Sequence, residues 1–508
     1  MSKKAYNALD EAWIPVLRPD RTVEHVGIRD ALVNAHLYVG VTESSPTVLV
    51  AIHRLLLAFL SRATGDGDRA AWYAATLPQE AIDRYCTTWQ DRFCLFHPDR
   101  PFMQVPLLAS DVEERVVDTN GEDRSKPAAA LALNSVSGNN VTLWGHAYDD
   151  APVELEPGEA LRLLLGHLSF QPMGLVRVFA TAAADSVLCN KAAVLPLGRT
   201  LAQTLCLSLH PTSGNDVPSW EQAAPSRELL GKTRQAFTGP NDRYTRLGRA
   251  VLLIPTETLT VRRLYYGVGI APLYEDNNLD PMAAYRVKVA KGKKYRRPVA
   301  FEEGRAAWRD LPCLLPDPDG MSNEPPRILE WARALLDEVG AYDEHLDVLV
   351  AGVSANKSAV LRWRLETTDI AAEFERNPEA AGRLRDLTAT IETAEFKFFK
   401  VAEQAIAAAM EHKPSKHTLA RSRAMLSSSS ARERFYQSIE NSFHRIRAAL
   451  AAARPTEEID GLLKAALLRS SSESLKQLEV LLGSSPQALR AMAIKGRDFG
   501  VLLSNYRI

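Results

Sequence analysis

The spacing of apolar residues along the chain changes once, near residue 325. Before this point, short alternating runs typical of strands are mixed with helical runs and many Pro or Gly breaks. After "LPDPDGMSNEPP" at 315–326, proline nearly vanishes and the apolar residues follow helical spacing. The pattern predicts an α+β protein with a mixed α/β domain over residues 1–365 and a C-terminal helical bundle over residues 366–508.

Three elements stand out in the first part. "VLVAIHRLLLAFLSRA" at 48–63 has helical spacing and predicts a largely buried helix. "EPGEALRLLLGHLSF" at 156–170 begins with Pro and acidic residues and predicts a second helix. At 286–298, "RVKVA" and "YRRP" alternate around "KGKK", which predicts a β-hairpin with Gly292 at its tip. Pro298 restricts the second strand of this hairpin to a sheet edge.

The second part contains consecutive amphipathic segments with short Ser or Pro breaks between them. The segments that the spacing predicts as helices are 394–410, 431–453, 458–470 and 488–506. Two serine clusters, "SSSS" at 427–430 and "SSSES" at 470–474, are interpreted as linkers. Short connections between consecutive helices favour an antiparallel bundle of three to five helices.

The composition, with 46% hydrophobic and 24% charged residues, is typical of a soluble globular protein. No run of 18 apolar residues is present, and the N-terminal segment lacks the apolar core of a signal peptide. Five cysteines form no CxxC and no pairing pattern, which favours reduced thiols. We therefore expect a cytoplasmic protein that does not enter a membrane.

A search for catalytic and metal-binding motifs finds little. The sequence has no P-loop, no GxGxxG after a strand, no HExxH and no GxSxG, and its 11 histidines lack metal-ligand spacing. "SANK" at 354–357 matches the S-x-x-K of serine β-lactamases, but its companion motifs are absent downstream. We expect no enzyme activity, no metal and no cofactor. A serine hydrolase built on Ser354 and Lys357 is the alternative.

Charge is balanced overall but concentrated locally. The chain carries 61 Lys+Arg and 62 Asp+Glu, yet 286–298 holds seven cations and no acid. This segment also contains Tyr295, and aromatic rings among cations are common on nucleic-acid-binding surfaces. Further basic residues are Lys413, Lys416, Arg421 and Arg423, and then Arg432, Arg434, Arg445 and Arg447. The pattern leaves two readings open, a surface for a polyanion and a solvated hairpin.

Several phrases, taken together, resemble one family. "LDEAWIPV" at 9–16, "HPDRPFMQV" at 97–105 and "SVSGNN" at 135–140 are followed in order by "DPMAAYR" and "LVAGVSANKSAVLRWR". They resemble the large subunit, called CasA or Cse1, of the type I-E CRISPR surveillance complex Cascade. The C-terminal helices are similar to the four-helix bundle of that family.

The resemblance implies a non-catalytic reader of DNA. Such a subunit recognises a short protospacer-adjacent motif in double-stranded DNA and helps to open the duplex so that the guide RNA can pair with it. Pairing then supplies the sequence specificity. The implied partners are target DNA, guide RNA, the other Cascade subunits and a helicase-nuclease. A structural scaffold that binds only guide RNA stays open as an alternative.

The resemblance also implies functional residues. A motif-reading loop that also anchors the subunit near the guide RNA corresponds to Ser137, Gly138, Asn139, Asn140, Leu143 and Trp144. Of the glycine-rich loop of relatives only Gly174 remains, and a wedge next to Trp308 corresponds to Arg309 and Asp310. The lysine that relatives use in motif reading has no match here.

The basic segments gain roles from the same resemblance. We expect Lys288, Lys291, Lys293, Lys294, Arg296 and Arg297 of the hairpin to contact phosphates, which positions DNA without specifying its sequence. Lys413, Lys416, Arg421 and Arg423 are expected to guide the displaced strand or the flanking duplex. Ser354 is expected to cap a helix near the start of the bundle.

Overall fold

The computed structural model divides the chain into two compact units. The first comprises Met1–Glu303 and Asp319–Ile370, and the second comprises Gly304–Pro318 and Ala371–Ile508. The structure describes residues 6–110, 125–133, 153–231, 233–275, 278–301, 305–317, 319–356 and 359–505. The mixed α+β character expected from the sequence is confirmed.

The first unit contains four small three-stranded sheets and one two-stranded ribbon in its described part, with strand orders β2-β1-β3, β14-β13-β7, β4-β9-β8, β11-β10-β12 and β5-β6. Its strands are β1 (Ile14–Leu17), β2 (Val23–Val26), β3 (Gly40–Val41), β4 (Lys126–Pro127), β5 (Gly174–Leu175), β6 (Ala182–Ala183), β7 (Ala193–Leu197), β8 (Arg249–Pro255), β9 (Val261–Val268), β10 (Tyr285–Ala290), β11 (Lys293–Pro298), β12 (Asn323–Glu324), β13 (Leu346–Asn356) and β14 (Ala359–Ile370). β14 runs through residue 366 and ends at Ile370, so the residue at which we expected the bundle to begin lies in a strand.

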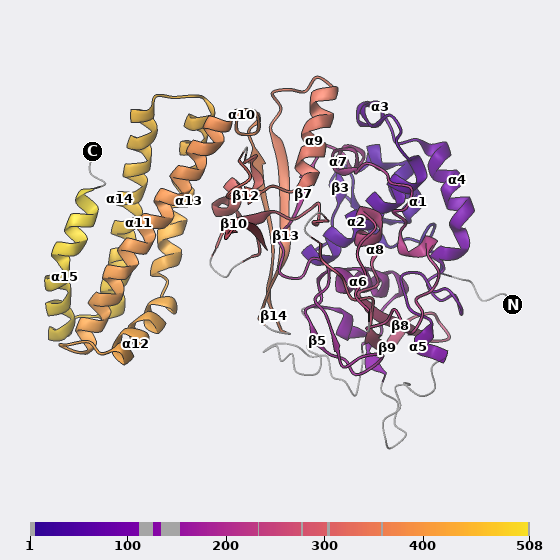
Figure 1. Cartoon of the computed structure of the whole chain (residues 1–508), viewed down its shortest axis with the longest axis horizontal. Coiled ribbons are helices and arrows are strands. Elements are labelled where there is room, and N and C mark those ends of the chain that lie inside the picture. The colour runs from indigo at the N-terminus through magenta and orange to yellow at the C-terminus, as the bar shows by residue number, and fades with distance from the viewer. Residues whose placement is uncertain are drawn as a thin grey trace, which may run out of the picture. The chain divides into compact units, whose positions relative to one another are not determined.

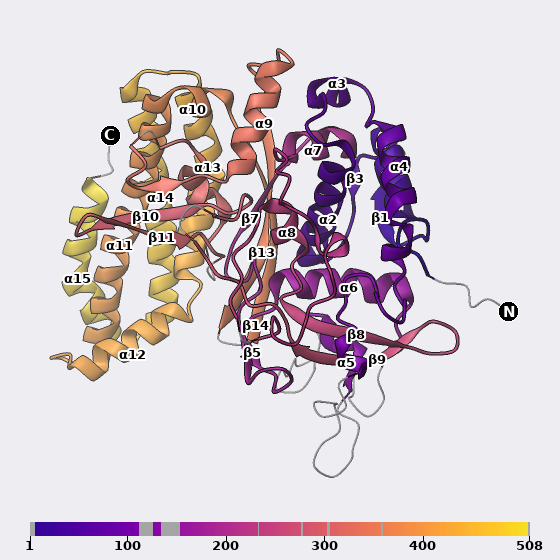
Figure 2. The ribbon, with the colours of Figure 1, turned by 45° about the vertical axis from the view of Figure 1, so that its right-hand side comes forward.

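Helices fill the space between these sheets (Figure 1). They are α1 (Ile28–Val33), α2 (Pro46–Thr64), α3 (Arg69–Ala74), α4 (Gln79–Trp89), α5 (Leu107–Ser110), α6 (Pro157–Phe170), α7 (Leu201–Ser208), α8 (Pro240–Thr245) and α9 (Arg327–Glu338). α2 and α6 confirm the helices predicted at 48–63 and 156–170. Figure 2 shows α6 lying along the β8–β9 pair.

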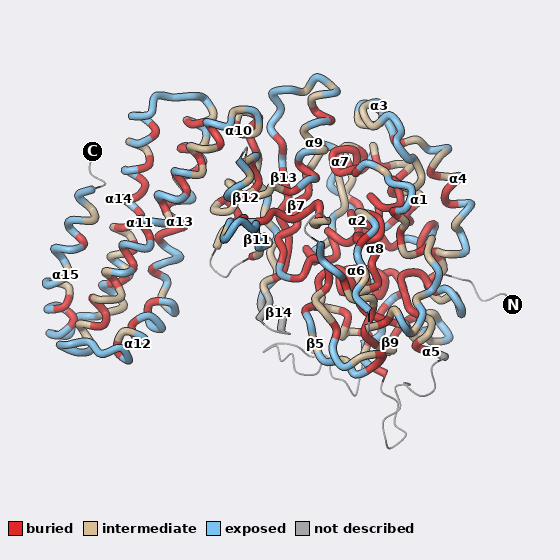
Figure 3. The backbone as a smooth tube through the Cα atoms, viewed as in Figure 1, coloured by how far each residue is buried: buried red, intermediate tan, exposed pale blue. Residues whose placement is uncertain are grey.

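The core of this unit is built around α2. Pro46 occupies the first turn, where a missing N–H is tolerated, and Gly65 ends the helix at φ 60°. α2 is the one helix in the described part of the chain long and apolar enough to cross a membrane, but 83% of that window is buried inside the protein. Figure 3 shows it red along nearly its whole length. Its apolar surface therefore serves as the core of this unit.

A buried ion pair fixes α2 to the segment that leads into β10. Arg54 Nη2 donates to Asp280 Oδ2 at 2.9 Å, and both side chains are fully buried. Lys191 and Arg243 are buried close enough to act on the same carboxylate. Burial alone would raise the pKa of Asp280, but Arg54, Arg243 and Lys191 outweigh it and hold that pKa below its ordinary value.

We expect Asp280→Asn to lower the free energy of unfolding by about 3–5 kcal/mol, because the substitution leaves three buried cations without a counter-charge. Urea unfolding followed by circular dichroism measures the change. The control is Glu24→Gln, which removes a partly exposed ion pair with Arg18 and should leave the free energy of unfolding nearly unchanged. Equal losses in the two variants would contradict this account.

A second prediction concerns Lys191. Burial lowers its pKa from 10.5 to about 8, so between these two values the unfolded chain holds a proton that the folded chain has lost. The free energy of unfolding should therefore rise with pH in that window, by up to about 1.4 kcal/mol per pH unit. Relative to Lys191→Met, the unsubstituted protein should gain stability from pH 8 to pH 10. Lys464→Met, at an exposed position, should show no such difference.

The second unit is helical in its described part. Its α-helices are α10 (Ala372–Arg376), α11 (Pro378–Met410), α12 (Lys416–Ser427), α13 (Ala431–Ala451), α14 (Thr456–Leu482) and α15 (Pro486–Ser504). Side-chain oxygens of Asn377, Ser415 and Ser485 cap α11, α12 and α15. Aromatic contacts join the helices. The ring centroids of Phe398 of α11 and Phe499 of α15 are 5.2 Å apart, and those of Phe399 of α11 and Phe435 of α13 are 6.1 Å apart.

One serine cluster was interpreted wrongly. "SSSES" at 470–474 is not a linker but lies in the middle of α14, where Ser470, Ser471 and Ser474 are buried. Ser470 and Ser474 donate hydrogen bonds to the carbonyls of Ala466 and Ala431. Hydroxyls satisfied by backbone carbonyls can be buried, and small side chains let α13 and α14 approach closely. The other cluster, at 427–430, does connect α12 to α13.

Candidate nucleic-acid interface

The basic segment at 286–298 forms the predicted hairpin. β10 and β11 pair antiparallel from Tyr285↔Pro298 to Ala290↔Lys293. The two residues between them, Lys291 and Gly292, have φ of 51° and 73°. Positive φ at both central positions is required by the type I′ turn, whose twist matches that of the strands. The tip at Gly292 and the edge position of Pro298 are both confirmed.

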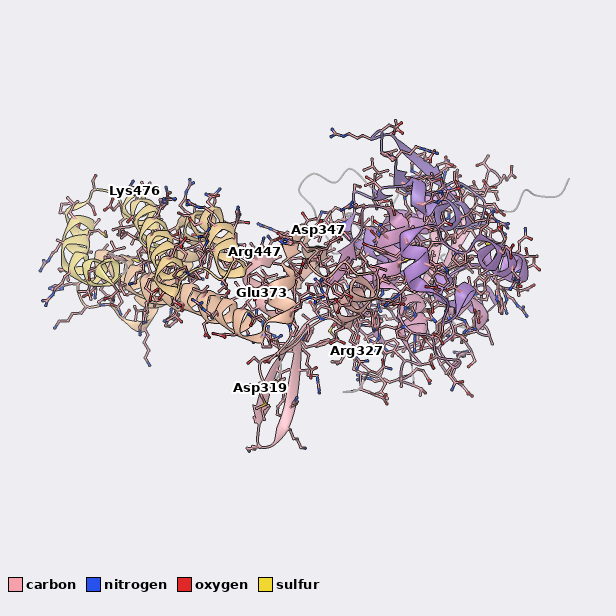
Figure 4. All side chains as sticks on the ribbon, turned by 90° about the horizontal axis from the view of Figure 1, so that it is seen from above. Asp319, Arg327, Asp347, Glu373, Arg447 and Lys476 are labelled. Carbon is pink, nitrogen blue, oxygen red and sulfur yellow. The ribbon has the colours of Figure 1, made fainter. Side chains whose placement is uncertain are left out.

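Most of the hairpin is a two-stranded ribbon. β12 pairs with β10 only at Tyr285 and Arg286, which leaves the outer part of the hairpin without a third strand. In Figure 2 β10 and β11 form a long ribbon, and in Figure 4 this ribbon projects beside Asp319. Beyond Arg286, β10 and β11 therefore have no neighbouring strand within the described part of the chain.

The strand register places the side chains of the ribbon on two different faces. We define the open face as Arg286, Lys288, Lys293, Tyr295 and Arg297, which pair across the strands as Arg286↔Arg297, Lys288↔Tyr295 and Ala290↔Lys293. Every one of these five residues is exposed. The opposite face, which we call the covered face, contains Tyr285 and Val287, which are buried at the root, and Val289 and Lys294, which are exposed nearer the tip. The open face thus carries four cations, one aromatic ring and no acid.

One of the predicted DNA contacts, Arg296, lies on the covered face, where an acidic residue neutralises its charge. Arg296 donates two hydrogen bonds to Glu324, at 2.7 and 2.9 Å, and both side chains are partly buried. Lys294 also belongs to this face, and its Nζ approaches Gly320. Arg296 is therefore held at the root of the hairpin, where its charge is balanced.

Five other cations of the hairpin lack such partners. Across the described residues, Lys288, Lys291, Lys293, Lys294 and Arg297 form no ion pair with an acid. Neighbouring like charges on a ribbon repel one another, and salt screens this only partly. The repulsion between these cations would fall if an anion such as a phosphate bound, because it would supply the negative charge that the described residues around them lack.

The register also adds residues to the site. The contacts predicted from the sequence include neither Arg286 nor Tyr295, although both lie on the open face. The signal that would have found them is the period-two alternation counted outward from Gly292. It assigns positions 286, 288, 293, 295 and 297 to one face once the turn is known.

A second basic surface lies on α12. Lys413 precedes this helix, Lys416 begins it, and Arg421 and Arg423 follow on it; all four are exposed. Arg423 is paired with Glu403 at 2.8 Å, which leaves the other three as the more available cations.

Three of the four arginines predicted on α13 differ in their surroundings. Arg432 pairs with Glu395 and lies over the ring of Phe399, so it takes part in the packing of the helices. Arg434 and Arg445 are exposed and share a face with Gln437 and Asn441. This face of α13 carries no acid between Arg434 and Arg445 along the i, i+3 and i+4 positions.

The proposed wedge residues are engaged within the helical unit. Arg309 donates to Glu392 at 3.3 Å and lies 3.7 Å from the centre of the Tyr436 ring. Asp310 is paired with Arg305 at 2.8 Å. Trp308 is buried against Phe443, with ring centroids 4.4 Å apart. These contacts fix the segment on α11 and α13, and Arg309 or Asp310 must give up an ion pair before binding anything else.

Gly174 lies in a short ribbon after α6. β5 and β6 pair as Gly174↔Ala183 and Leu175↔Ala182, and no atom lies within 4 Å of the position that a Cβ at Gly174 would occupy. Met173 and Leu175 beside it are 53% and 71% exposed. This small, exposed ribbon is open to close approach by a partner.

Two predictions meet different outcomes. The loop residues Ser137 to Asn140, Leu143 and Trp144 lie outside the described residues, as does Lys357. Ser354 does not cap a helix, because it lies in β13 opposite Arg362 of β14. Among the described residues no group of three or more His, Cys, Asp or Glu could hold a metal ion.

Comparison with known proteins gives a consistent picture. A family model described as CRISPR-associated protein Cse1 matches residues 7–478. The CasA/Cse1 protein of Thermus thermophilus is 32% identical over 518 residues, which cover 99% of this chain and 98% of that protein.

Solved structures are similar over the whole chain as well. The structure of Thermus thermophilus CasA (Cse1) is 29% identical, with a TM-score of 0.81, over 99% of this chain and 100% of that one. A chain in a CRISPR RNA-guided surveillance complex is similar in fold, at 21% identity and a TM-score of 0.74, over 98% of this chain and 99% of that one.

Proposed function

Because the chain belongs to the CRISPR-associated Cse1 family, also named CasA, we propose that it is the DNA-reading large subunit of a type I-E surveillance complex. In this proposal it recognises the protospacer-adjacent motif in double-stranded DNA and helps to open the duplex for the guide RNA. It also recruits the helicase-nuclease that degrades the target. The subunit is non-catalytic and acts in the cytoplasm.

One observation carries the DNA-binding part of this proposal. The hairpin presents exposed cations that have no acidic partner among the described residues, in a chain whose net charge is only -1. A solvated surface usually mixes charges of both signs. Cations that are left unpaired at one place, while Arg296 beside them is paired, are typical of a surface that receives phosphates.

The other predicted contacts take secondary roles in the proposal. Lys413, Lys416 and Arg421 would guide the displaced strand or the flanking duplex, and the ribbon at Gly174 would approach the minor groove, where small residues permit close contact. The loop with Ser137 to Asn140, Leu143 and Trp144 would contact the guide RNA. We further propose that α11, α13, α14 and α15 form the four-helix bundle of the family.

We expect replacement of Lys288, Lys293 and Arg297 by alanine to weaken binding of duplex DNA by the guide-loaded complex. Each lost phosphate contact should reduce the slope of log K against log salt by about 0.9, so three contacts should reduce it by about two to three units. The loss should be similar for duplexes with and without the adjacent motif, because phosphate contacts carry no sequence information. Titration of labelled duplex at several salt concentrations measures both quantities.

A matched control is replacement by alanine of Arg21, Arg84 and Arg100, which are exposed elsewhere in the same unit. It removes the same charge and should leave the salt slope within about 0.5 of the original value. If the hairpin variant and this control behave alike, net charge rather than the hairpin governs binding. The scaffold reading would then gain support.

The reading function itself has a separate test. Guide-loaded complex is prepared with and without this subunit, and its binding to duplexes that differ only in the adjacent motif is compared. We expect the subunit to tighten binding in a motif-dependent way, because the reader must bind before pairing begins. Binding that is unaffected by adding the subunit would contradict the proposal.

A further inference from the structure

We propose that Tyr295 on the open face of the hairpin is a stacking platform for a base of single-stranded DNA. This inference rests on the proposed function, since that function supplies DNA as the partner. It goes further in assigning to the open face of the hairpin an unpaired strand in addition to the phosphates of a duplex, and in naming the side chain that distinguishes the two ligands.

The ring of Tyr295 is available. The residue is 55% exposed, and its side chain takes part in no ring contact, no cation–π contact and no hydrogen bond within the described residues. Most tyrosines in the described part of the chain differ in this respect; Tyr85, for example, packs on Phe59 and donates to Glu221. An exposed aromatic ring without contacts leaves both its apolar body and its hydroxyl to solvent or to a ligand.

The cations surround this ring on one surface. Lys288 lies directly across the ribbon from Tyr295, and Lys293 and Arg297 lie two residues before and after it on the same strand. Residues two apart in a strand lie about 6.6 Å from each other and point to the same face. The ring therefore lies between cations that can hold the phosphates on either side of a stacked base.

This combination favours an unpaired strand. In a duplex the bases are stacked on one another and offer only their edges to a protein, so a ring on a ribbon gains nothing from base stacking. An unpaired strand exposes the faces of its bases, and sites for it combine a track of cations with aromatic rings. Stacking accepts every base, which suits a subunit whose ligand has no fixed sequence.

The position of the ring argues against a packing role. β10 and β11 have no third strand beside Lys288 and Tyr295, and the apolar residues of the ribbon, Val287 and Val289, lie on the covered face. Removing the ring should therefore change binding and leave the fold intact. This makes the side chain suitable for a direct test.

The test uses the full-length chain with three ligands, namely a short single-stranded DNA, its blunt duplex and the corresponding RNA. Tyr295→Leu should weaken binding of the DNA strand about 10-fold, since stacking on one ring contributes about 1–3 kcal/mol. Binding of the duplex should change less than about 2-fold, because its bases are already stacked. Tyr295→Phe retains the ring and should bind like the original protein, and Tyr342→Leu is a control at another exposed tyrosine.

A strand with 2-aminopurine at successive positions supplies a second readout. Its fluorescence should be quenched at one or two positions by the original protein and by Tyr295→Phe, but not by Tyr295→Leu. Equal losses of strand and duplex binding in Tyr295→Leu, or no loss at all, would overturn the stacking proposal. Tenfold tighter binding of RNA than of DNA would also overturn it.

Failure of the stacking proposal can be distinguished from failure of the proposed function. If Lys288, Lys293 and Arg297 are needed for duplex binding but Tyr295→Leu has no effect, only the stacking platform is lost. If the three cations and the ring are all dispensable for strand and duplex alike, the hairpin does not bind DNA. The stacking proposal and the DNA-binding role of the hairpin are then both overturned, and motif-dependent binding by the guide-loaded complex still decides the reading function.

Discussion

The Arg54–Asp280 ion pair is the constraint on which the hairpin depends. Asp280 accepts from Arg54 of α2 and from the N–H of Met282, and its backbone N–H donates to the hydroxyl of Tyr285, the first residue of β10. The main chain that follows is held on both sides, because Val194 N–H donates to the carbonyl of Met282 and Ile328 N–H donates to that of Pro281. A fully desolvated carboxylate thus connects α2 to the root of the hairpin, and main-chain hydrogen bonds connect β7 and α9 to the same segment. Such pairs define geometry more than they stabilise the fold.

This anchoring explains how one hairpin can hold so many unpaired cations. Repulsion between the side chains of the open face would separate two strands that were held only by their own hydrogen bonds, because an isolated hairpin is marginally stable. Here the root is buried: Tyr285 and Val287 lie in the core, and Arg296 is neutralised by Glu324. The structure therefore concentrates its rigidity at one end of the ribbon and its charge at the other.

The sequence predicts elements better than it predicts which side chains face a partner. Helix α2, helix α6 and the turn at Gly292 follow from local signals, namely apolar spacing, Pro at the first turn and a residue that tolerates positive φ. The serines of α14 carry a turn-like local signal, and only the packing of α13 against it makes them core residues. Arg309 and Asp310 looked like contacts for DNA, but their acceptors and donors, Glu392 and Arg305, can be identified only once the chain is folded.

The cations of the chain fall into two groups, those in internal ion pairs and those available to a ligand. Arg54, Arg296 and Arg309 each have a carboxylate within 3.3 Å, and each holds two parts of the chain together. Lys288 and Arg297, by contrast, have no acid beside them in the described part of the chain. The seven cations of 286–298 therefore do not act as one patch. Arg296 is paired with Glu324 at the root, Lys294 lies on the covered face and Lys291 lies in the turn, so the open face carries the other four cations together with Tyr295.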